Sequence, residues 1–535
     1  MNAISIISFI LFTGLVALIS WYKTRNENLK TSSGLFFANR NLGFLLVGGA
    51  LFFTNISATQ FIGENESVYT NNMTVMAWGM SSVFAMLIVS EFIMPIYLKG
   101  GISTTPDFLE DRFDTTTKKL VSIIFLISYL LNMLPSVLYS GAVAFNGLFH
   151  FSEIFKIDYW QTIWILVWVM GVIGCLYSIL GGLKAIAISD TVLGIGMFAG
   201  GILLPYFGLK YLGNGNVGQG IKIILSSKPA HLNAIGGSKD AIPFSTIFTG
   251  MLLMNLYYWG TEQYIVQQAL SSRSLAESQK GIAAACVGKI ISPLLLNIPG
   301  LIAVHLYTTM DNTAEVFPKM ASDVSPPLLT GYIAAIIFGA ALTTFNAGLN
   351  SSSTLFVLNL YKPLKAKQQK HVSEMQLIRV GKLFEIAACL LAMFVAPFII
   401  FAKDGLYTYL QMVGGFFSVP IFTILFIGFI TKRVPAIAAK IGLVFFFLAY
   451  AATQLVFDTG LHFLHVLAII FLATLAVMLL IGKMYPMPVP YKQKMNNLVD
   501  LKPWKNRHIY SLILLLLMVL VFAIFSPLGI MRWNF

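Results

Sequence analysis

Five neutral hydrogen-bonding side chains lie in the middle of one long hydrophobic segment of this chain. Residues 42–63 read LGFLLVGGALFFTNISATQFIG, and the polar side chains are Thr54, Asn55, Ser57, Thr59 and Gln60. An unpaired polar group in hydrocarbon is costly, so a lipid-facing helix would not retain five of them. We therefore expect an interrupted helix that faces an interior site, where freed backbone carbonyls can hold a cation. This pattern is typical of a transporter.

A second hydrophobic segment is interrupted in the same way. Residues 251–267 read MLLMNLYYWGTEQYIVQ, in which Asn255, Gly260 and the run 261–263 break an apolar pattern. Either segment alone fits an ordinary helix with a polar interior face equally well. Two interrupted helices five spans apart, however, are the pattern of transporters built from inverted repeats.

A hydroxyl-rich helix offers oxygen ligands to the same cation. Residues 338–354 read FGAALTTFNAGLNSSST. Most of these hydroxyls are expected to bond the backbone of their own helix. The adjacent pair Thr343 and Thr344 is more specific, because carbonyls of 53–56 and two hydroxyls together supply about five neutral oxygens. Neutral ligands suit a weakly bound monovalent ion better than Ca²⁺.

A set of polar side chains at membrane depth predicts a solute site. Amides offer both donors and acceptors, and the aromatic faces of Tyr258 and Trp259 can cover the apolar face of a sugar ring. For any single amide, a hydrogen bond between helices is an equally good explanation. Together the set favours a small, polar, largely uncharged solute. Its members are Asn55, Gln60, Ser82, Asn255, Tyr258, Trp259, Lys289 and Gln411.

Ionisable residues within the apolar segments fall into three groups. Lys289 lies near the middle of its segment, where a charge is costly and functional by default; it either pairs with a carboxylate or donates to a solute. Asp190 lies near the inner end of a segment, where it either guides an exiting cation or caps a helix. Glu91, Glu262 and Glu385 are expected at the membrane interfaces.

The elements that must position these residues are membrane-spanning helices. The chain of 535 residues is 57% hydrophobic and 11% charged, with a mean hydropathy of +0.79, whereas soluble domains are typically about 25% charged. Apolar runs of about 20 residues mark the spans of a polytopic membrane protein. The expected spans are 3–22, 42–69, 73–98, 118–147, 160–180, 186–212, 243–269, 279–307, 326–360, 377–402, 405–430, 434–457, 461–482 and 508–531.

The net charge of +13 indicates topology rather than nucleic-acid binding. With an external N-terminus and alternating spans, 26 of the 35 Lys and Arg residues lie in or beside the inside loops. The positive-inside rule then predicts both termini outside. Basic residues do not alternate with aromatic ones, and no soluble domain carries a basic patch, so we expect no nucleic-acid partner.

Enzymatic and metal chemistry are not indicated. Cys175, Cys286 and Cys389 all fall inside apolar spans, without a CxxC spacing, so we expect buried thiols and no metal cluster. The sequence has no P-loop, no HExxH motif and no nucleophile–base arrangement. We therefore expect a protein that is not an enzyme and does not itself couple ATP.

Several motifs give the chain a family resemblance. They are TNISATQFIG, GISTTPDFLEDRFD, ILGGLKAIAISD, NLYYWGTEQYIVQQAL with SLAESQKG, and ALTTFNAGLNSSSTLF, spread over nearly the whole length. With these motifs the chain resembles the solute:sodium symporter (sodium/glucose cotransporter) family, and within it the bacterial sodium/galactose symporter-like branch.

The resemblance implies an all-α integral membrane protein with a LeuT-type five-plus-five inverted repeat and discontinuous helices. One transmembrane transporter domain, 1–535, would comprise an extra helix at 3–22, a first repeat at 42–212, a second at 243–430 and three extra helices at 434–531. It also implies residence in the bacterial inner (plasma) membrane, embedded in the lipid bilayer, and a monomer or weak homodimer.

The resemblance also implies roles for individual residues. Sodium would be the coupling ion, held by carbonyls of Phe53, Ile56 and Ala340 and by hydroxyls of Thr343 and Thr344. Asp190 matches the aspartate linked to sodium release. The sugar site would fall on the polar set named above, with Tyr258, beside Trp259, as the inner gate beneath the sugar.

The chain departs from the sugar-transporting pattern at three positions. Thr59 and Gly79 stand where relatives carry glutamates, and Met133, next to Asn132, stands where they carry an asparagine. Loss of the carboxylate at position 79 removes a strong acceptor for hydroxyl groups and one counter-charge for Lys289. Glu64 and Glu66 are additional carboxylates where relatives have small or apolar residues.

The resulting prediction is a sodium-coupled secondary active symporter that imports a small polar solute, best matched by a sugar, by alternating access. A first alternative keeps the mechanism but moves an acidic sugar, an inositol or another organic solute. A second alternative is a membrane solute sensor that no longer transports. Such sensors usually carry appended signalling domains, and this chain ends about four residues after its last expected span.

Overall fold

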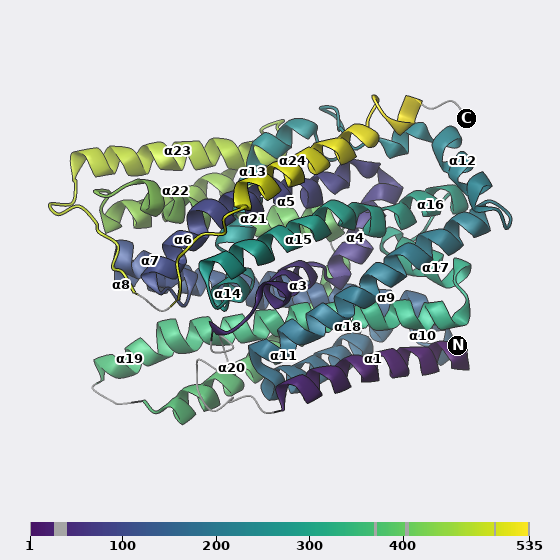
Figure 1. The fold of residues 1–535 in the computed structure, drawn as a ribbon, viewed down its shortest axis with the longest axis horizontal. Coiled ribbons are helices and arrows are strands. Elements are labelled where there is room, and N and C mark those ends of the chain that lie inside the picture. The colour runs from purple at the N-terminus through teal and green to yellow at the C-terminus, as the bar shows by residue number, and fades with distance from the viewer. Residues whose placement is uncertain (1, 26–39, 369–371, 402–405, 497–498, 533–535) are drawn as a thin grey trace.

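The structure is a computed structural model that describes residues 2–25, 40–368, 372–401, 406–496 and 499–532. Over these residues the chain forms helices and turns but no strand. Most helices run along the longest axis of the molecule, and α1 begins at the same end of the bundle at which α24 ends (Figure 1).

Most of the α-helices lie within the predicted spans, and the short helices at 105–112, 151–155, 217–227, 316–324 and 362–367 lie between them. The α-helices form three groups along the chain. The first group is α1 (Ala3–Thr24), α3 (Phe44–Asn55), α4 (Ala58–Thr70), α5 (Met76–Ile88), α6 (Met94–Gly100), α7 (Thr105–Arg112), α8 (Thr115–Ser128), α9 (Leu134–Phe149), α10 (Phe151–Phe155), α11 (Tyr159–Leu212) and α12 (Val217–Ser227). The second is α13 (Gly250–Gly260), α14 (Gln263–Leu270), α15 (Leu275–Leu296), α16 (Ile298–Leu306), α17 (Val316–Val324), α18 (Pro327–Leu355), α19 (Lys362–Lys367), α20 (Glu374–Val395) and α21 (Leu406–Ile430). The last is α22 (Ala436–Leu455), α23 (Phe463–Met484) and α24 (Arg507–Ile524).

Short segments of other helix types join these elements. Three π-helical turns, η3 (Val89–Ile93), η4 (Tyr129–Met133) and η8 (Phe356–Tyr361), continue α5, α8 and α18 without a break. The 3-10 turns are η2 (Met73–Val75), η5 (Pro229–Leu232), η6 (Phe244–Phe248), η7 (Thr313–Glu315), η9 (Ala396–Phe401) and η10 (Ile530–Arg532).

Both predicted helix interruptions are present. Between α3 and α4, Ile56 and Ser57 adopt extended conformations, and the two helix axes differ by 54°. Between α13 and α14, Thr261 and Glu262 leave the helical conformation. A helix end leaves its last carbonyls without partners in the helix. The breaks therefore supply backbone oxygens that can accept hydrogen bonds from side chains of other helices or bind a ligand.

The number of spans agrees with the prediction of about fourteen. Twelve helical segments of the described chain are long and apolar enough to cross a membrane, and the bent pair α3–α4 makes a thirteenth. The remaining expected span, 243–269, corresponds to α13 and α14, each too short to cross alone. The spans 160–180 and 186–212 both fall within α11, as Tyr159–Ile179 and Leu183–Leu212.

The centre of the bundle is formed by α3, α15, α11 and α18. The first two pack against each other, as do α11 and α18. The segments Leu275–Leu306 and Pro327–Lys367 are the most buried spans, whereas α1 and α24 lie at the periphery. The central position of α15 and α18 places Lys289 and Thr343–Thr344 inside the protein rather than against lipid.

Candidate functional site

A cavity of about 230 Å³ lies between the two broken helices and α5, η4, α15 and α21. Every residue of the predicted solute set lines it, although the set comes from six helices, α3, α4, α5, α13, α15 and α21. The lining members of the set are Asn55, Gln60, Ser82, Asn255, Tyr258, Trp259, Lys289 and Gln411. The structure therefore brings the whole predicted set together at one place.

Two amide oxygens in this cavity are left without a protein donor. Asn55 lies close to the Tyr258 hydroxyl, and Gln60 lies close to the Glu64 side chain. Within the described part of the chain, Asn55 Oδ1 and Gln60 Oε1 are nevertheless enclosed and unpaired. Since buried polar atoms are normally satisfied, these two oxygens are positioned to accept hydrogen bonds from a solute.

Other polar members of the set are already engaged. Asn255 Nδ2 donates to Ser81 Oγ at 2.9 Å, and Ser82 Oγ donates to the Gly79 carbonyl at 2.6 Å. Ser82 therefore offers a lone pair rather than its proton to the cavity. These bonds fix the rotamers of both side chains before any solute enters.

Tyrosines and a carboxylate close one end of the cavity. Tyr264 donates to the Tyr258 hydroxyl at 2.8 Å, and the ring of Tyr258 lies edge-on to that of Trp259 with centroids 5.2 Å apart. Glu262 lines the cavity here and accepts a hydrogen bond from Tyr129. The expectation that Glu262 lies at a membrane interface is wrong, because the helix break turns it inward.

Glu91 and Glu385, the other two carboxylates expected at the membrane interfaces, lie in different environments. Glu91 is half-buried and pairs with Arg507, whose Nε lies 2.9 Å from Glu91 Oε2. Glu385 is buried and accepts from Ser178 Oγ at 3.0 Å, so its predicted interface position is also wrong. Its burial follows from packing of α20 against α11, which hydropathy does not indicate.

Lys289 has a counter-charge that the sequence interpretation missed. The side chain is buried on α15, and its Nζ lies 5.9 Å from the centroid of the Trp259 ring. It interacts electrostatically with Glu64, which is buried on α4. The sequence could have indicated this carboxylate, because Gln60 and Glu64 are four residues apart and therefore share one face of a helix.

The positions that depart from the sugar-transporting pattern also line the cavity. Thr59 accepts from Ser140 Oγ at 3.1 Å, which is a neutral contact. At Gly79 a Cβ atom would meet Ser292 Oγ at 3.6 Å, an ordinary contact, so the missing side chain leaves usable space. Met133 and Asn132 both reach the cavity wall from η4.

The predicted sodium ligands gather beside this cavity. Phe53, Ile56, Ala340 and Thr343 line a second, much smaller space of about 10 Å³ together with Asp190. Such a space holds about one water-sized sphere. The lining of this space is mostly apolar, and Thr343 and Asp190 are the polar side chains among its lining residues. Thr344 instead lines the larger cavity.

Two threonines link the small space to the larger cavity. Thr344 Oγ1 donates to the Thr54 carbonyl at 2.9 Å, across from α18 to the end of α3. The Thr54 hydroxyl in turn donates to the Asp190 carboxylate. The backbone that would hold the ion is therefore continuous with Asn55, the first polar residue of the solute cavity.

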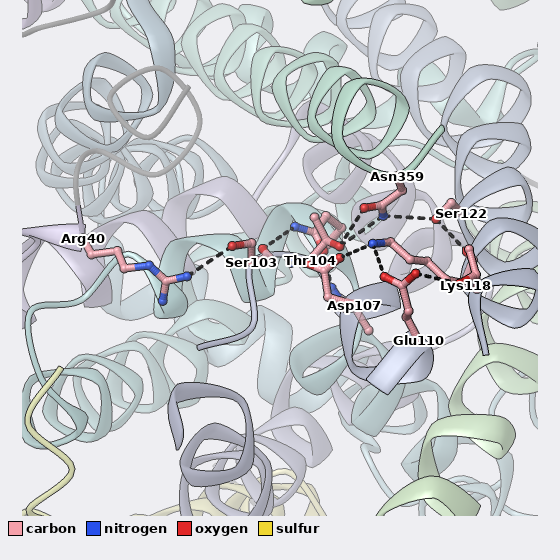
Figure 2. Close-up of polar contacts among 11 residues, drawn as sticks. Arg40, Ser103, Thr104, Asp107, Glu110, Lys118, Ser122 and Asn359 are labelled. Carbon is pink, nitrogen blue, oxygen red and sulfur yellow. Dashed lines mark hydrogen bonds and ion pairs between the residues drawn. The ribbon is translucent and has the colours of Figure 1, made fainter. Parts of the chain in front are cut away.

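A polar network surrounds α7 (Figure 2). Lys118 Nζ contacts Asp107 Oδ1 at 2.8 Å and Glu110 Oε2 at 2.7 Å. Asn359 Nδ2 donates to Thr104 Oγ1 and Ser122 Oγ, both at 3.1 Å. The network thus joins α7 to α8 and to η8.

From the same helix, Thr105 reaches the second break. Its backbone N–H donates to Gln263 Oε1 and its hydroxyl donates to the Thr261 carbonyl, both at 2.8 Å. Residues 102–107 therefore tie the beginning of α14 to α8 and η8.

Comparison with known proteins gives consistent matches. The model of the sodium:solute symporter family matches residues 35–445. The chain is 40% identical to an uncharacterized symporter, YidK, of Escherichia coli over 99% of this chain and 92% of the relative. It is 27% identical to the sodium/glucose cotransporter of Vibrio parahaemolyticus over 83% of this chain and 84% of the relative.

Solved structures support the fold. A Na⁺-coupled sialic acid symporter in a substrate-bound outward-open state matches with a TM-score of 0.78 and 19% identity, over 92% of this chain and all of the other. Mhp1, a nucleobase-cation-symport-1 family transporter, matches with a TM-score of 0.57 and 14% identity, over 89% of this chain and 98% of the other. The fold is the expected LeuT type. The chain is thus a multi-pass membrane protein with sodium as its coupling ion, and it belongs to the sodium:solute symporter family.

Proposed function

We propose that this protein is a secondary active symporter that uses the sodium gradient to import a small, polar, uncharged solute, best matched by a sugar. The observation that carries the proposal is the convergence of eight polar and aromatic side chains from six helices on one cavity of about 230 Å³. Relatives that transport glucose or myo-inositol share the family. A cavity of this size suits a single ring rather than an oligosaccharide.

Hydrogen-bonding groups in the cavity support a polyhydroxylated solute. Asn55 Oδ1 and Gln60 Oε1 would accept from hydroxyl groups, and Lys289 would donate to one. Gln411 and Asn255 add amide groups from α21 and α13. Tyr258 and Trp259 would cover the apolar face of the ring, with Tyr258 as the gate that moves to release it inward.

Coupling between sodium and the solute would follow because both sites include residues at the break between α3 and α4. Sodium held by Phe53, Ile56, Ala340, Thr343 and Thr344 would order the end of α3 and with it Asn55. Asp190, which accepts from Thr54, would receive the ion on its way out. A unit charge crossing 100 mV contributes about 2.3 kcal/mol, to which the sodium concentration ratio adds.

For the organisation of the chain, we propose repeats at 42–212 and 243–430, an extra helix at 3–22 and three more at 434–531. We also propose a bacterial inner-membrane location with both termini external. The shared end of α1 and α24 supports termini on one side. A C-terminal fusion to alkaline phosphatase would be active in that orientation and inactive in the opposite one.

Each of two alternatives to this proposal predicts a different experimental result. A symporter for an acidic sugar, an inositol or another organic solute would show sodium-driven uptake of that solute instead. A membrane sensor would bind solute without sodium-driven flux. The match of the chain to whole transporters favours transport over sensing.

Uptake into proteoliposomes tests the proposal. The panel would contain radiolabelled hexoses, myo-inositol and hexuronates, each with an inward sodium gradient and with a matched potassium gradient. We expect one neutral hexose to accumulate in sodium only. Accumulation of myo-inositol or a hexuronate alone, or binding of a sugar without accumulation, would overturn the proposal in favour of one of the alternatives.

A further inference from the structure

Glu64 lies on α4, which packs against α15, the helix that carries Lys289. It follows Gln60 by one helical turn on α4, and Gln60 itself lines the cavity. Glu64 interacts with Gln60, Tyr407 and Lys289, and all three of these residues line the cavity. The carboxylate is only 4% exposed, so its charge is felt in the cavity rather than screened by bulk water.

Lys289 needs this carboxylate, because it is only 2% exposed and a buried ammonium ion is costly without an opposite charge. Other nearby carboxylates are engaged elsewhere in the described structure. Glu262 accepts from Tyr129 at the break of α13 and α14, and Asp190 accepts from Thr54 beside the ion space. Glu66 accepts from Thr313 Oγ1 at 2.6 Å.

We propose that Glu64 determines the charge preference of the solute site by compensating Lys289. This inference rests on the proposed function and names the substrate class more narrowly. With Glu64 present, Lys289 and its partner together carry no net charge, so a neutral polyhydroxylated solute enters without bringing an unpaired charge into a buried site. An anionic solute would compete with Glu64 for Lys289 and would meet like-charge repulsion.

The absence of a side chain at Gly79 fits this assignment. Thr59 is neutral and Gly79 has no side chain, so neither can compensate Lys289 from the cavity wall. Glu64 supplies the charge from one turn behind Gln60 and leaves the space at Gly79 to the solute. Lys289 thus keeps an opposite charge nearby, although the cavity at position 79 differs in shape from the sugar-transporting pattern.

Replacement of Glu64 by glutamine tests whether this carboxylate sets the preference for neutral over anionic solutes. Uptake of D-galactose, myo-inositol and D-galacturonate would be compared in wild type, Glu64→Gln and Glu66→Gln. Glu66→Gln is the matched control, a buried carboxylate on the same helix that does not line the cavity. We expect the ratio of neutral to anionic uptake to fall at least tenfold in Glu64→Gln and to stay unchanged in Glu66→Gln. An unchanged ratio in both variants, or a wild type that prefers galacturonate, overturns the inference.

A second measurement examines the charge pair without any solute. Thermal unfolding in detergent would be followed for Glu64→Gln, Lys289→Met and the double variant. We expect each single variant to unfold at a lower temperature and the double variant to recover part of the loss, whereas purely additive losses would overturn the pairing. Failure of wild-type sodium-driven uptake would instead overturn the proposed function, so the two failures are distinguishable.

Discussion

Thr54 and Thr344 connect the ion space to the solute cavity at the scale of single residues. Thr344 Oγ1 donates to the Thr54 carbonyl at 2.9 Å, and the Thr54 hydroxyl donates to Asp190. The next residue, Asn55, presents its unpaired Oδ1 in the cavity. An ion that draws the carbonyls of the break together would therefore also fix the orientation of a solute ligand.

The hydroxyls of Thr343 and Thr344 are expected to set the affinity for sodium. In Thr343→Ala/Thr344→Ala, we expect the sodium concentration for half-maximal uptake to rise at least tenfold, equivalent to about 1.4 kcal/mol. Ser352→Ala is the control, because Ser352 Oγ donates to the Leu349 carbonyl of its own helix at 2.8 Å. Equal sodium dependence in wild type and the double variant would remove these hydroxyls from the ion site.

The polar site residues could be predicted because they interrupt apolar segments. Asn55 and Asn255 stand out in sequence for that reason, and both line the cavity. Glu262 could not be placed in the same way. A carboxylate near the end of an apolar run resembles an interfacial residue until the position of the helix break is known.

At the scale of elements, α7 holds the second broken helix against its neighbours. Thr105 bonds to both Thr261 and Gln263, at the break that positions Tyr258 (Figure 2 shows the adjoining contacts). Asn359 and Lys118 bond the same helix to η8 and α8. Movement of α14 would have to break these bonds.

Loss of the Thr105 hydroxyl is expected to loosen α14. In Thr105→Val, which keeps the shape but removes the donor to the Thr261 carbonyl, we expect amide hydrogen exchange over residues 263–270 to accelerate several-fold. Thr115→Val is the control, since Thr115 donates to Glu110 at an exposed site. Exchange at the wild-type rate in Thr105→Val would show that α7 does not restrain α14.

The first turn of α8 should show a charge-dependent contribution to stability. Burial alone would raise the pKa of Asp114, but hydrogen bonds from Lys440 and Thr117 outweigh this and hold the pKa below its usual value. A lowered pKa means that the stabilisation is complete above the unfolded value of about 3.9 and is lost as the pH falls through the folded pKa.

Asp114→Asn isolates this contribution, because asparagine can still cap the helix. We expect a loss of at most about 1 kcal/mol at pH 7, since the pair with Lys440 at 2.5 Å is partly exposed. Thermal unfolding compared at pH 7 and at about pH 2 should show the difference shrinking at the lower pH, because the stabilisation is lost only below the unfolded pKa. A difference that does not change with pH would contradict the assignment, and Asp458→Asn, at an exposed loop, serves as the control.

Most elements could be predicted from hydropathy, and the exceptions have physical causes. α13 and α14 were expected as one interrupted span because their polar residues break an apolar run. The exact ends of such a pair depend on tertiary contacts, such as those of Thr261 with Thr105. Hydropathy also gives no sign of α7, a short amphipathic helix capped by Thr104 and Asp107.

At the scale of the whole molecule, the fold places both helix breaks in the interior and the chain ends at one side of the bundle (Figure 1). The apolar surfaces of α1, α22 and α24 face outward, as expected for lipid contact. The polar cavity and the smaller ion space are thereby removed from lipid. Coupling depends on this arrangement, because an ion and a solute can share one helix end only if both sites meet there.

The measurement that tests the central claim most directly is the current evoked by solute in proteoliposomes on a solid-supported membrane. With sodium present, addition of the neutral sugar or inositol taken up by wild type should produce an inward current. The current should disappear when potassium replaces sodium and in Thr343→Ala/Thr344→Ala. Solute flux that persists without sodium, or solute binding with sodium but without current, would contradict sodium-coupled symport.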